Sequence, residues 1–202
     1  MTTVNEVVGE NADDGHEYPQ DSWNATTWFG HYGTSDLWLV TRFQTVNVPK
    51  NAIITSATYT MTERVTEGGT YTVNAKVRAQ LIADASAPGA ANLPSDFTLT
   101  AAGTDLDVVS TSWVDNQTTA VDVTAIIQEI VNQATWAANN DINIVIVNDG
   151  TTGDKDLGTY NYEDTAAKAA KLDIEYTVAA TKPDKRPLGL NKGIGKRVTQ
   201  TL

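Results

Sequence analysis

Residues 121–148 read VDVTAIIQEIVNQATWAANNDINIVIVN, and the two halves of this stretch decide the fold class. In the first half, apolar residues recur with the 3.6-residue period of one helix face, at Val123, Ile126, Ile127, Ile130 and Val131. Asp122 or Thr124 can accept hydrogen bonds from the first free backbone N–H groups of such a helix. The pattern therefore predicts one helix over about 123–134.

The second half of the stretch changes from the helical period to a β-strand pattern. Residues 139–141, Asn-Asn-Asp, have the chemistry of a turn. Residues 142–147 follow as INIVIV, in which Asn143 is the only polar residue. We therefore expect a strand over 142–148 that is covered on both faces for most of its length. The helix would then close one edge of a sheet or one end of a sandwich.

Outside this stretch, short segments of alternating apolar and polar residues predict the strands of an antiparallel sheet. The clearest cover 37–46, 53–65, 73–81 and 171–178, and shorter strands are expected at 3–8, 96–101, 107–114, 118–123 and 157–162. Residues 9–36 show little periodicity and are predicted to form loops with one or two short strands. Because short strands without βαβ alternation form antiparallel layers, the predicted fold is an all-β, jelly-roll-like sandwich with one helix.

The composition limits which covalent and metal-binding chemistry the chain can carry and whether it is expected to enter a membrane. The 202 residues include no cysteine, which rules out disulfide bonds and thiolate metal sites. The first residues lack the basic start and apolar run of a signal peptide, and no apolar segment approaches the roughly 20 residues that cross a bilayer. We therefore expect a soluble protein with no signal peptide, no transmembrane segment and no membrane partner.

Charge is divided unevenly between the body of the chain and its end. Residues 182–202 hold six basic residues and one aspartate, a net charge of +5. Residues 1–181 hold the other eight basic residues and 24 acidic residues, a net charge of −16. Because a strongly acidic body repels nucleic acid, we do not expect nucleic acid as a partner. This boundary predicts a β-sandwich domain, 1–181, and a basic tail, 182–202.

The tail mixes proline and glycine with scattered apolar and basic residues, and it lacks the apolar content to fold alone. One interpretation is a disordered, solvated segment. The interpretation that we favour is an extended arm that orders on a partner, with apolar side chains in grooves and cations paired with acids. The residues expected to make these contacts are Lys185, Arg186, Leu188, Leu190, Lys192, Ile194, Lys196, Arg197 and Val198.

Five aromatic residues lie within 16 positions, from Trp23 to Trp38. Such a cluster can be buried under its own loop, form a subunit contact or stack on sugar rings. The candidates for a glycan or subunit contact are Trp23, Trp28, Phe29 and Tyr32. Trp113 and Trp136 flank the predicted helix and its preceding strand, and both are expected in the core.

The remaining polar residues do not indicate catalysis. His16 and His31 both lie in the poorly patterned region 9–36, and no motif supplies the third group that orients a catalytic base. Among 25 acidic residues some pair always has a glycosidase-like separation, so the acids alone identify no site. We therefore expect no enzyme activity and nominate no catalytic residue.

Two acidic groups admit a metal-binding interpretation. Asp13 and Asp14 are weak candidates for a hard-cation site, because calcium prefers clustered oxygen ligands. Asp149, Asp154 and Asp156 form a second acidic turn. The alternative for both groups is that they are solvated acids in turns, since neither has the spacing of an EF-hand loop. No metal or other cofactor is expected.

Three segments resemble motifs of the DNRLRE-type modules, a family of β-sandwich domains grouped with carbohydrate-binding-like jelly rolls. They are RF…VPKNAIITSA within 42–57, DVT followed by IIQEIV within 122–131, and YNYED…AAKLDIEY within 160–176. The resemblance covers about 37–178. Asn51 stands where the family has a turn glycine and Ala170 where it has a closing proline, and both changes are compatible with the fold.

The resemblance implies two functions. DNRLRE-type domains occur in long exported bacterial wall or polysaccharide-binding proteins, and related free-standing copies occur among bacteriophage virion proteins. A compact copy without an export signal is more similar to the phage version, so we expect a capsid decoration or accessory protein on the virion surface. Its expected partners are the major capsid protein or other virion proteins, further copies of itself, and a surface glycan. The alternative prediction is a carbohydrate-binding module for host-surface glycans.

Overall fold

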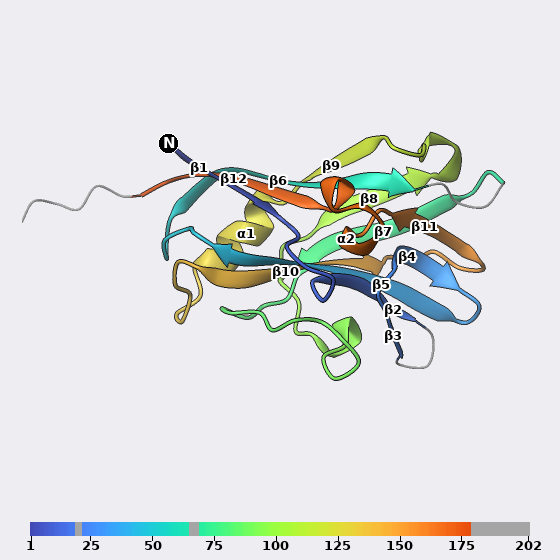
Figure 1. The fold of residues 1–202 in the computed structure, drawn as a ribbon, viewed down its shortest axis with the longest axis horizontal. Helices are drawn as coiled ribbons and strands as arrows, with labels where there is room; N and C mark the ends of the chain where they lie inside the picture. Colours follow the sequence, from blue (N-terminus) through green and yellow to red (C-terminus); the bar gives the residue numbers. More distant parts are fainter. Residues whose placement is uncertain (19–21, 65–68, 179–202) are drawn as a thin grey trace, which may run out of the picture.

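A computed structural model describes residues 1–18, 22–64 and 69–178, and the described residues form twelve strands, two α-helices and three 3-10 helices (Figure 1). The strands are β1 (Thr2–Val7), β2 (Asp14–Tyr18), β3 (Ser22–Asn24), β4 (Thr27–Tyr32), β5 (Ser35–Val46), β6 (Ile53–Arg64), β7 (Thr72–Ala79), β8 (Thr104–Val109), β9 (Thr118–Asp122), β10 (Asn140–Asn148), β11 (Lys155–Thr159) and β12 (Lys171–Thr177). The α-helices are α1 (Thr124–Val131) and α2 (Tyr162–Thr165), and the 3-10 helices are Pro94–Asp96, Ser110–Ser112 and Ala166–Lys168.

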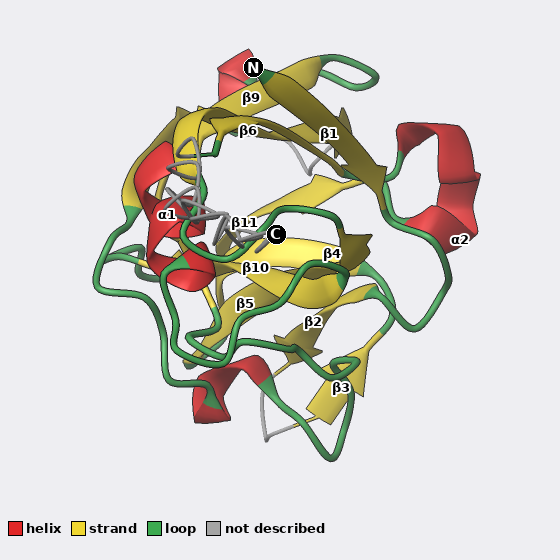
Figure 2. Ribbon diagram, turned by 90° about the vertical axis from the view of Figure 1, so that its left-hand side faces the viewer, coloured by secondary structure: helices red, strands yellow, loops and turns green. Residues whose placement is uncertain are grey.

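The strands join in the order β1-β12-β6-β11-β4-β5-β10-β7-β8, with β2 and β3 added at β5 and β9 added at β6. The long strand β5 pairs with β4 at its start and with β10 and β2 farther along, while β6 pairs with β12, β9 and, near its end, β11. The sheet thereby folds over, so that β1, β6 and β9 face β5 and β10 (Figures 1 and 2). The predicted antiparallel, jelly-roll-like sandwich is confirmed.

The main core lies between the two layers. Tyr59 and Met61 on β6 meet Phe43 on β5, and the Phe43 and Tyr59 rings pack edge to face with their centroids 6.1 Å apart. The predicted alternation is confirmed within β6 and β12, because their inward residues are buried, but Val178, which was also predicted to point inward, follows the end of β12 and is exposed. Helix α1 adds Ile126, Ile127 and Ile130, none of which is exposed, and so closes the core beside β6.

Helix α1 is shorter than the predicted 123–134. Its start follows the prediction, since Asp122 Oδ1 accepts a hydrogen bond from the Thr124 N–H at 2.8 Å. At its end, the Asn51 N–H donates to the Val131 carbonyl at 3.0 Å, and the Trp136 indole N–H donates to the Val48 carbonyl at 2.9 Å. The Val131 carbonyl thus accepts from the 48–51 turn instead of from the next turn of the helix, and the chain leaves the helix after Val131.

Strand β10 is buried on both faces, as predicted. Ile142, Ile144 and Ile146 point into the main core. The other face belongs to a second apolar cluster of Val40, Phe97, Val145 and Val147, with Trp23, Trp38 and Leu99 packed against it. Asn143 is fully buried, and its amide donates to Gln80 Oε1 and to the Ser86 carbonyl. The loop after β7 therefore covers this face and satisfies the Asn143 amide N–H groups.

Several other boundaries differ from the prediction. The expected strand 96–101 is wrong, because Pro94 begins a 3-10 helix and only Leu99 forms an isolated bridge, with Gln80. The strand expected at 107–114 is β8, which ends five residues earlier at a 3-10 turn, and the strand expected at 157–162 is β11, followed by α2. Asn161 caps α2 by accepting the Asp164 N–H, a signal that the strand assignment overlooked.

Region 9–36 contains more regular structure than expected, with β2, β3, β4 and the start of β5. In the part of the chain that the structure describes, no helix is both long and apolar enough to cross a bilayer. The boundary predicted at residue 181 and the tail 182–202 lie outside the described residues.

Candidate functional site

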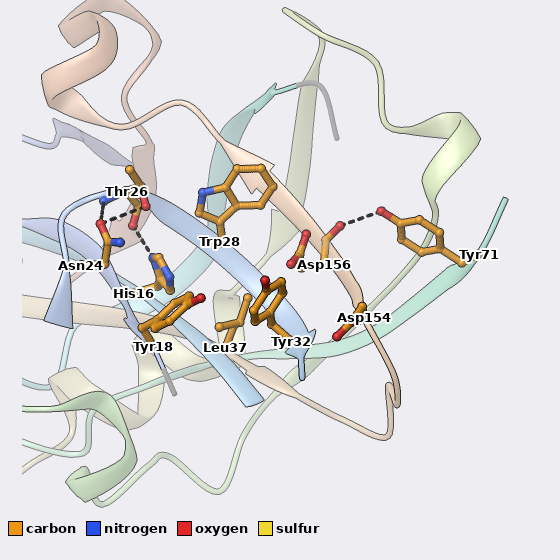
Figure 3. A pocket seen from close by; sticks show the side chains of 10 residues that line it. All are labelled: His16, Tyr18, Asn24, Thr26, Trp28, Tyr32, Leu37, Tyr71, Asp154 and Asp156. Atoms are coloured by element: carbon orange, nitrogen blue, oxygen red, sulfur yellow. Dashed lines mark hydrogen bonds between the residues drawn. The ribbon is translucent and has the colours of Figure 1, made fainter. Parts of the chain in front are cut away.

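A cleft of about 460 Å³ lies beside the outer face of β4 (Figure 3). Its lining combines aromatic rings, polar side chains and two carboxylates. The aromatic residues are Tyr18, Trp28, Tyr32 and Tyr71. The other lining residues are His16, Asn24, Thr26, Leu37, Asp154 and Asp156. These residues come from β2, β3, β4, β5 and β11 and from the segments beside them, so the fold brings together positions from 16 to 156.

Strand β4 divides the predicted aromatic candidates between its two faces. Trp28 and Tyr32 line the cleft. Phe29 lies on the opposite face with no exposed surface, and its ring packs edge to face on Trp113 at a centroid distance of 5.7 Å. The prediction that Phe29 contacts a glycan or subunit is therefore wrong, because alternation along β4 directs it into the core. Trp113 and Trp136 are buried in that core, as predicted.

Trp23 does not line the cleft either. It is half-buried on β3 and packs against the apolar cluster on the outer face of β10. Its ring occupies the space beside Gly15, where an added Cβ would lie 2.3 Å from the indole. A glycine is required there, since any larger residue would displace the ring. The contacts of Trp23 are thus with its own domain.

Trp28 is held flat against the sheet by a glycine on the neighbouring strand. Gly158 on β11 is the register partner of Trp28, and a Cβ added to it would lie 3.1 Å from the indole six-membered ring. The missing side chain leaves room for the indole to cover the strand. A ring supported in this way is a rigid surface, which lowers the entropic cost of contact with a ligand.

Tyr18 and Tyr32 form the second aromatic element of the cleft. Their ring centroids are 5.8 Å apart, with 35° between the planes, and both side chains are substantially exposed. Partial loss of solvent around the ring, then the neighbouring Tyr32 and the Asp156 carboxylate, raise the pKa of Tyr18. The Tyr18 phenol therefore stays protonated at neutral pH and can both donate and accept hydrogen bonds.

His16 supplies a buried acceptor on the side of Tyr18. The His16 ring is 2% exposed, and its Nδ1–H donates to the Thr26 carbonyl at 2.6 Å. Burial lowers the pKa of His16, with the Thr26 hydrogen bond acting in the opposite direction. The ring is thus neutral at neutral pH, and its Nε2 is an acceptor that no described residue engages.

The acidic side of the cleft is fixed by contacts with the β4–β5 turn. Asp154 Oδ1 accepts a hydrogen bond from the Gly33 N–H at 2.6 Å, and the Gly153 carbonyl accepts one from His31 Nδ1 at 3.0 Å. The Tyr71 hydroxyl donates to the Asp156 carbonyl at 2.9 Å (Figure 3). These bonds place the carboxylate-bearing segment before and within β11 against the aromatic strand β4.

The weak metal candidates Asp13 and Asp14 have other partners. Asp13 is fully buried, and its two oxygens accept from Arg42 Nη1 at 3.0 Å and Gln44 Nε2 at 2.8 Å. Asp14 is 1% exposed and accepts the Tyr162 N–H at 2.9 Å. Within 1–18, 22–64 and 69–178, no group of three or more histidine, aspartate or glutamate side chains could hold a metal ion. Both aspartates belong to a buried hydrogen-bonding network rather than to a solvated turn.

The residues predicted for the tail arm cannot be placed. Lys185, Arg186, Leu188, Leu190, Lys192, Ile194, Lys196, Arg197 and Val198 all lie outside the described residues. The sequence predicts Trp28 and Tyr32 as contact residues but gives no signal that places them beside Tyr18, Tyr71 or His16. For Asp154 and Asp156 the sequence suggests only an acidic turn, solvated or metal-binding. These residues lie together only because β4 pairs with β11, and no local pattern in the sequence predicts that pairing.

Comparison with known proteins adds no relative to this description. No model of a known protein family matches the chain, and no curated protein is significantly similar to it. The resemblance to DNRLRE-type domains stays a prediction based on three motifs.

Proposed function

We propose that this chain is a carbohydrate-binding β-sandwich whose glycan site is the cleft beside β4. The observation that carries the proposal is the convergence of Trp28, Tyr32, Tyr18 and Tyr71 on one cavity that also presents hydrogen-bonding side chains. A sugar ring has apolar C–H faces and a rim of hydroxyl groups. Aromatic faces and polar groups arranged around one cavity match both parts of such a ligand.

The size and rigidity of the cleft also support a sugar ligand. About 460 Å³ falls within the range of small-molecule sites and accommodates a short oligosaccharide segment. Trp28 is supported by Gly158, and the Asp154 segment is tied to Gly33, so the wall of the cleft is held by contacts within the domain. Little ordering is then needed on binding, which favours measurable affinity from a small contact area.

The test is binding of the full chain to a panel of glycans, followed by titration calorimetry with each glycan retained. Trp28→Ala should reduce affinity at least about tenfold, equal to about 1.4 kcal/mol, because it removes the stacking surface. Tyr160→Ala is the matched control, since the Tyr160 ring lies under the Lys168 ammonium, its hydroxyl donates to Asp115 Oδ1, and it does not line the cleft. No binding across the panel, or equal losses in the two variants, would overturn the proposal.

We infer a second, compatible role as a bacteriophage capsid decoration or accessory protein. The supporting observation is the separation of charge in the sequence, +5 in residues 182–202 against −16 in the rest. A basic arm can pair with acidic surfaces of a capsid protein or of a neighbouring copy, and repetition on a lattice strengthens weak contacts. In this role the sandwich would present its cleft to host-surface glycans.

This second role is tested by removing the arm. A chain ending at residue 181 should keep the unfolding transition of the full chain but no longer co-sediment with particles of the phage that encodes it. Replacing Lys185, Arg186, Lys196 and Arg197 by glutamine tests the charge contribution without shortening the chain. Undiminished co-sedimentation of the truncated chain would contradict an anchoring function for the arm.

A further inference from the structure

The polar groups of the cleft are unusually rich in hydrogen-bond acceptors. Neutral His16 offers Nε2 as an acceptor, and Asp154 contributes a carboxylate. The described residues that line the cleft include no lysine or arginine. The hydroxyl groups of Tyr18 and Tyr32 can adapt as donor or acceptor. A ligand that brings extra donors therefore suits this cleft better than one that brings acceptors or negative charge.

His16 adds to the exposed carboxylates a hydrogen-bond acceptor on a ring that is held in place by burial. Its ring is 2% exposed and contributes to the lining, while Nδ1 is already committed to the Thr26 carbonyl at 2.6 Å. His16 Nε2 is not sealed from the cleft, since the buried polar atoms without a partner in the described residues belong to Asp14, Gln133 and Asn143, and Nε2 can therefore accept a hydrogen bond from a ligand there. Asp154 and His16 are drawn on opposite sides of Tyr32 (Figure 3). A ligand that reaches both must carry donors at two separated positions.

We propose that the cleft selects glycans that carry a free amino group, with the sugar ammonium bound at Asp154 and a sugar hydroxyl donating to His16 Nε2. This proposal rests on the proposed glycan-binding function and names the class of sugar. An ammonium group has three donors and no acceptor, and its hydrogen bonds to carboxylate are charge-assisted. Stacking on Trp28 would contribute affinity for any sugar, whereas the carboxylate would discriminate between sugars. Acetylation of the amine removes the charge and should remove that discrimination.

Asp154 offers a conservative test of this discrimination. Only its Oδ1 is used by the Gly33 N–H, so Asp154→Asn keeps an oxygen acceptor for that bond while it removes the negative charge. The matched control is Asp107→Asn, which removes the same charge from an exposed position on β8 that does not line the cleft. The two variants have equal net charge, so any effect of the overall field of the acidic protein is common to both.

The experiment titrates the full chain and both variants with a glucosamine tetrasaccharide and with its fully N-acetylated counterpart, at about pH 6.5, where the sugar amine is largely protonated and His16, whose pKa is lowered from 6.5, is mainly neutral. The expected result for the full chain is about tenfold tighter binding of the amine form, the size of one charge-assisted hydrogen bond. Asp154→Asn should lose most of this ratio, with less than about twofold change in affinity for the N-acetylated form. Asp107→Asn should retain the ratio.

The outcomes separate this inference from the function on which it rests. If the N-acetylated form binds as tightly as the amine form, or if Asp154→Asn and Asp107→Asn lower the ratio equally, amine selection is overturned. The glycan-binding function still stands in that case, provided that Trp28→Ala abolishes binding of either sugar. If neither sugar nor any glycan of the wider panel binds, both proposals fail.

Discussion

Replacing Asp14 with asparagine should change how the stability of the domain depends on pH. Asp14 is 1% exposed, Tyr162 N–H donates to its Oδ2, and its Oδ1 is buried with no hydrogen-bond partner in the described structure. Burial, opposed by the Tyr162 hydrogen bond and reinforced by nearby Asp13, Glu163 and Asp164, raises the pKa of Asp14 from 3.8 to about 7. The folded protein thus binds a proton that the unfolded chain releases at lower pH.

The sign of the effect follows from proton linkage. Because the folded pKa exceeds the unfolded one, the unfolded state holds fewer protons between pH 3.8 and about 7, and stability falls as pH rises through this window. At about 1.36 kcal/mol for each unit of pKa, the contribution of Asp14 to the free energy of unfolding should decrease by about 4 kcal/mol. Asparagine cannot titrate, so Asp14→Asn should lack this decrease, whatever constant offset its amide introduces.

Urea unfolding followed by tryptophan fluorescence measures the difference directly, since the chain has five tryptophans. The free energy of the variant minus that of the wild type should rise by about 4 kcal/mol from roughly pH 4 to pH 8, with unchanged m-values. Asp107→Asn, which removes an exposed charge, separates this effect from the change in net charge. A difference between Asp14→Asn and wild type that stays constant over the whole range would refute the reasoning.

Three further predictions concern the core and the cleft. Phe29→Ala should lower the free energy of unfolding by about 3–5 kcal/mol in urea, because Phe29 is fully buried. Gly158→Ala should weaken glycan binding in calorimetry with little loss of stability, because its Cβ would lie 3.1 Å from the Trp28 ring and shift the stacking surface. Glu63→Gln should cost about 1–3 kcal/mol in urea unfolding, because the two oxygens of this 4% exposed carboxylate accept the Val114 N–H at 2.5 Å and the Thr119 hydroxyl at 2.6 Å, whereas an amide has only one acceptor oxygen.

Local patterns in the sequence were sufficient for the fold class. The alternation in 53–64 and 171–177 fixed which residues face inward, and the 3.6-residue period identified α1, because these patterns reflect contact with one shared core. The predictions failed where partners distant in sequence decide the local structure. Helix α1 stops at Val131 because the 48–51 turn binds the Val131 carbonyl and the Trp136 indole, and no pattern within 121–136 contains that information.

The same distinction explains the candidate site. The clustering of aromatic residues in 23–38 is visible in the sequence. Which rings face a ligand depends on which alternate residues of the strand point outward, and residues 9–36 show no periodicity from which to predict this. The prediction placed Phe29 with Trp28 because adjacent aromatic residues have the same chemistry. The structure separates them, since one is in the core and the other lines the cleft. The acidic side of the cleft could not be predicted from local patterns, because Gly33 and Asp154, which are hydrogen-bonded, are 121 residues apart in the sequence.

Phe29 nevertheless contributes to the cleft through the strand register. In the β4–β11 pair, Phe29 is opposite Leu157, and both side chains are fully buried on the core face. The next pair, Trp28 opposite Gly158, lies on the cleft face. A slip of one residue would move Phe29 and Leu157 out of register and would place a side chain larger than glycine under the indole. The buried pair thus opposes any register in which Trp28 loses its support. Phe29→Ala should therefore lower the affinity for glycan as well as the stability of the fold, even under conditions where the variant remains folded. Replacing an exposed residue far from the core should leave the affinity unchanged.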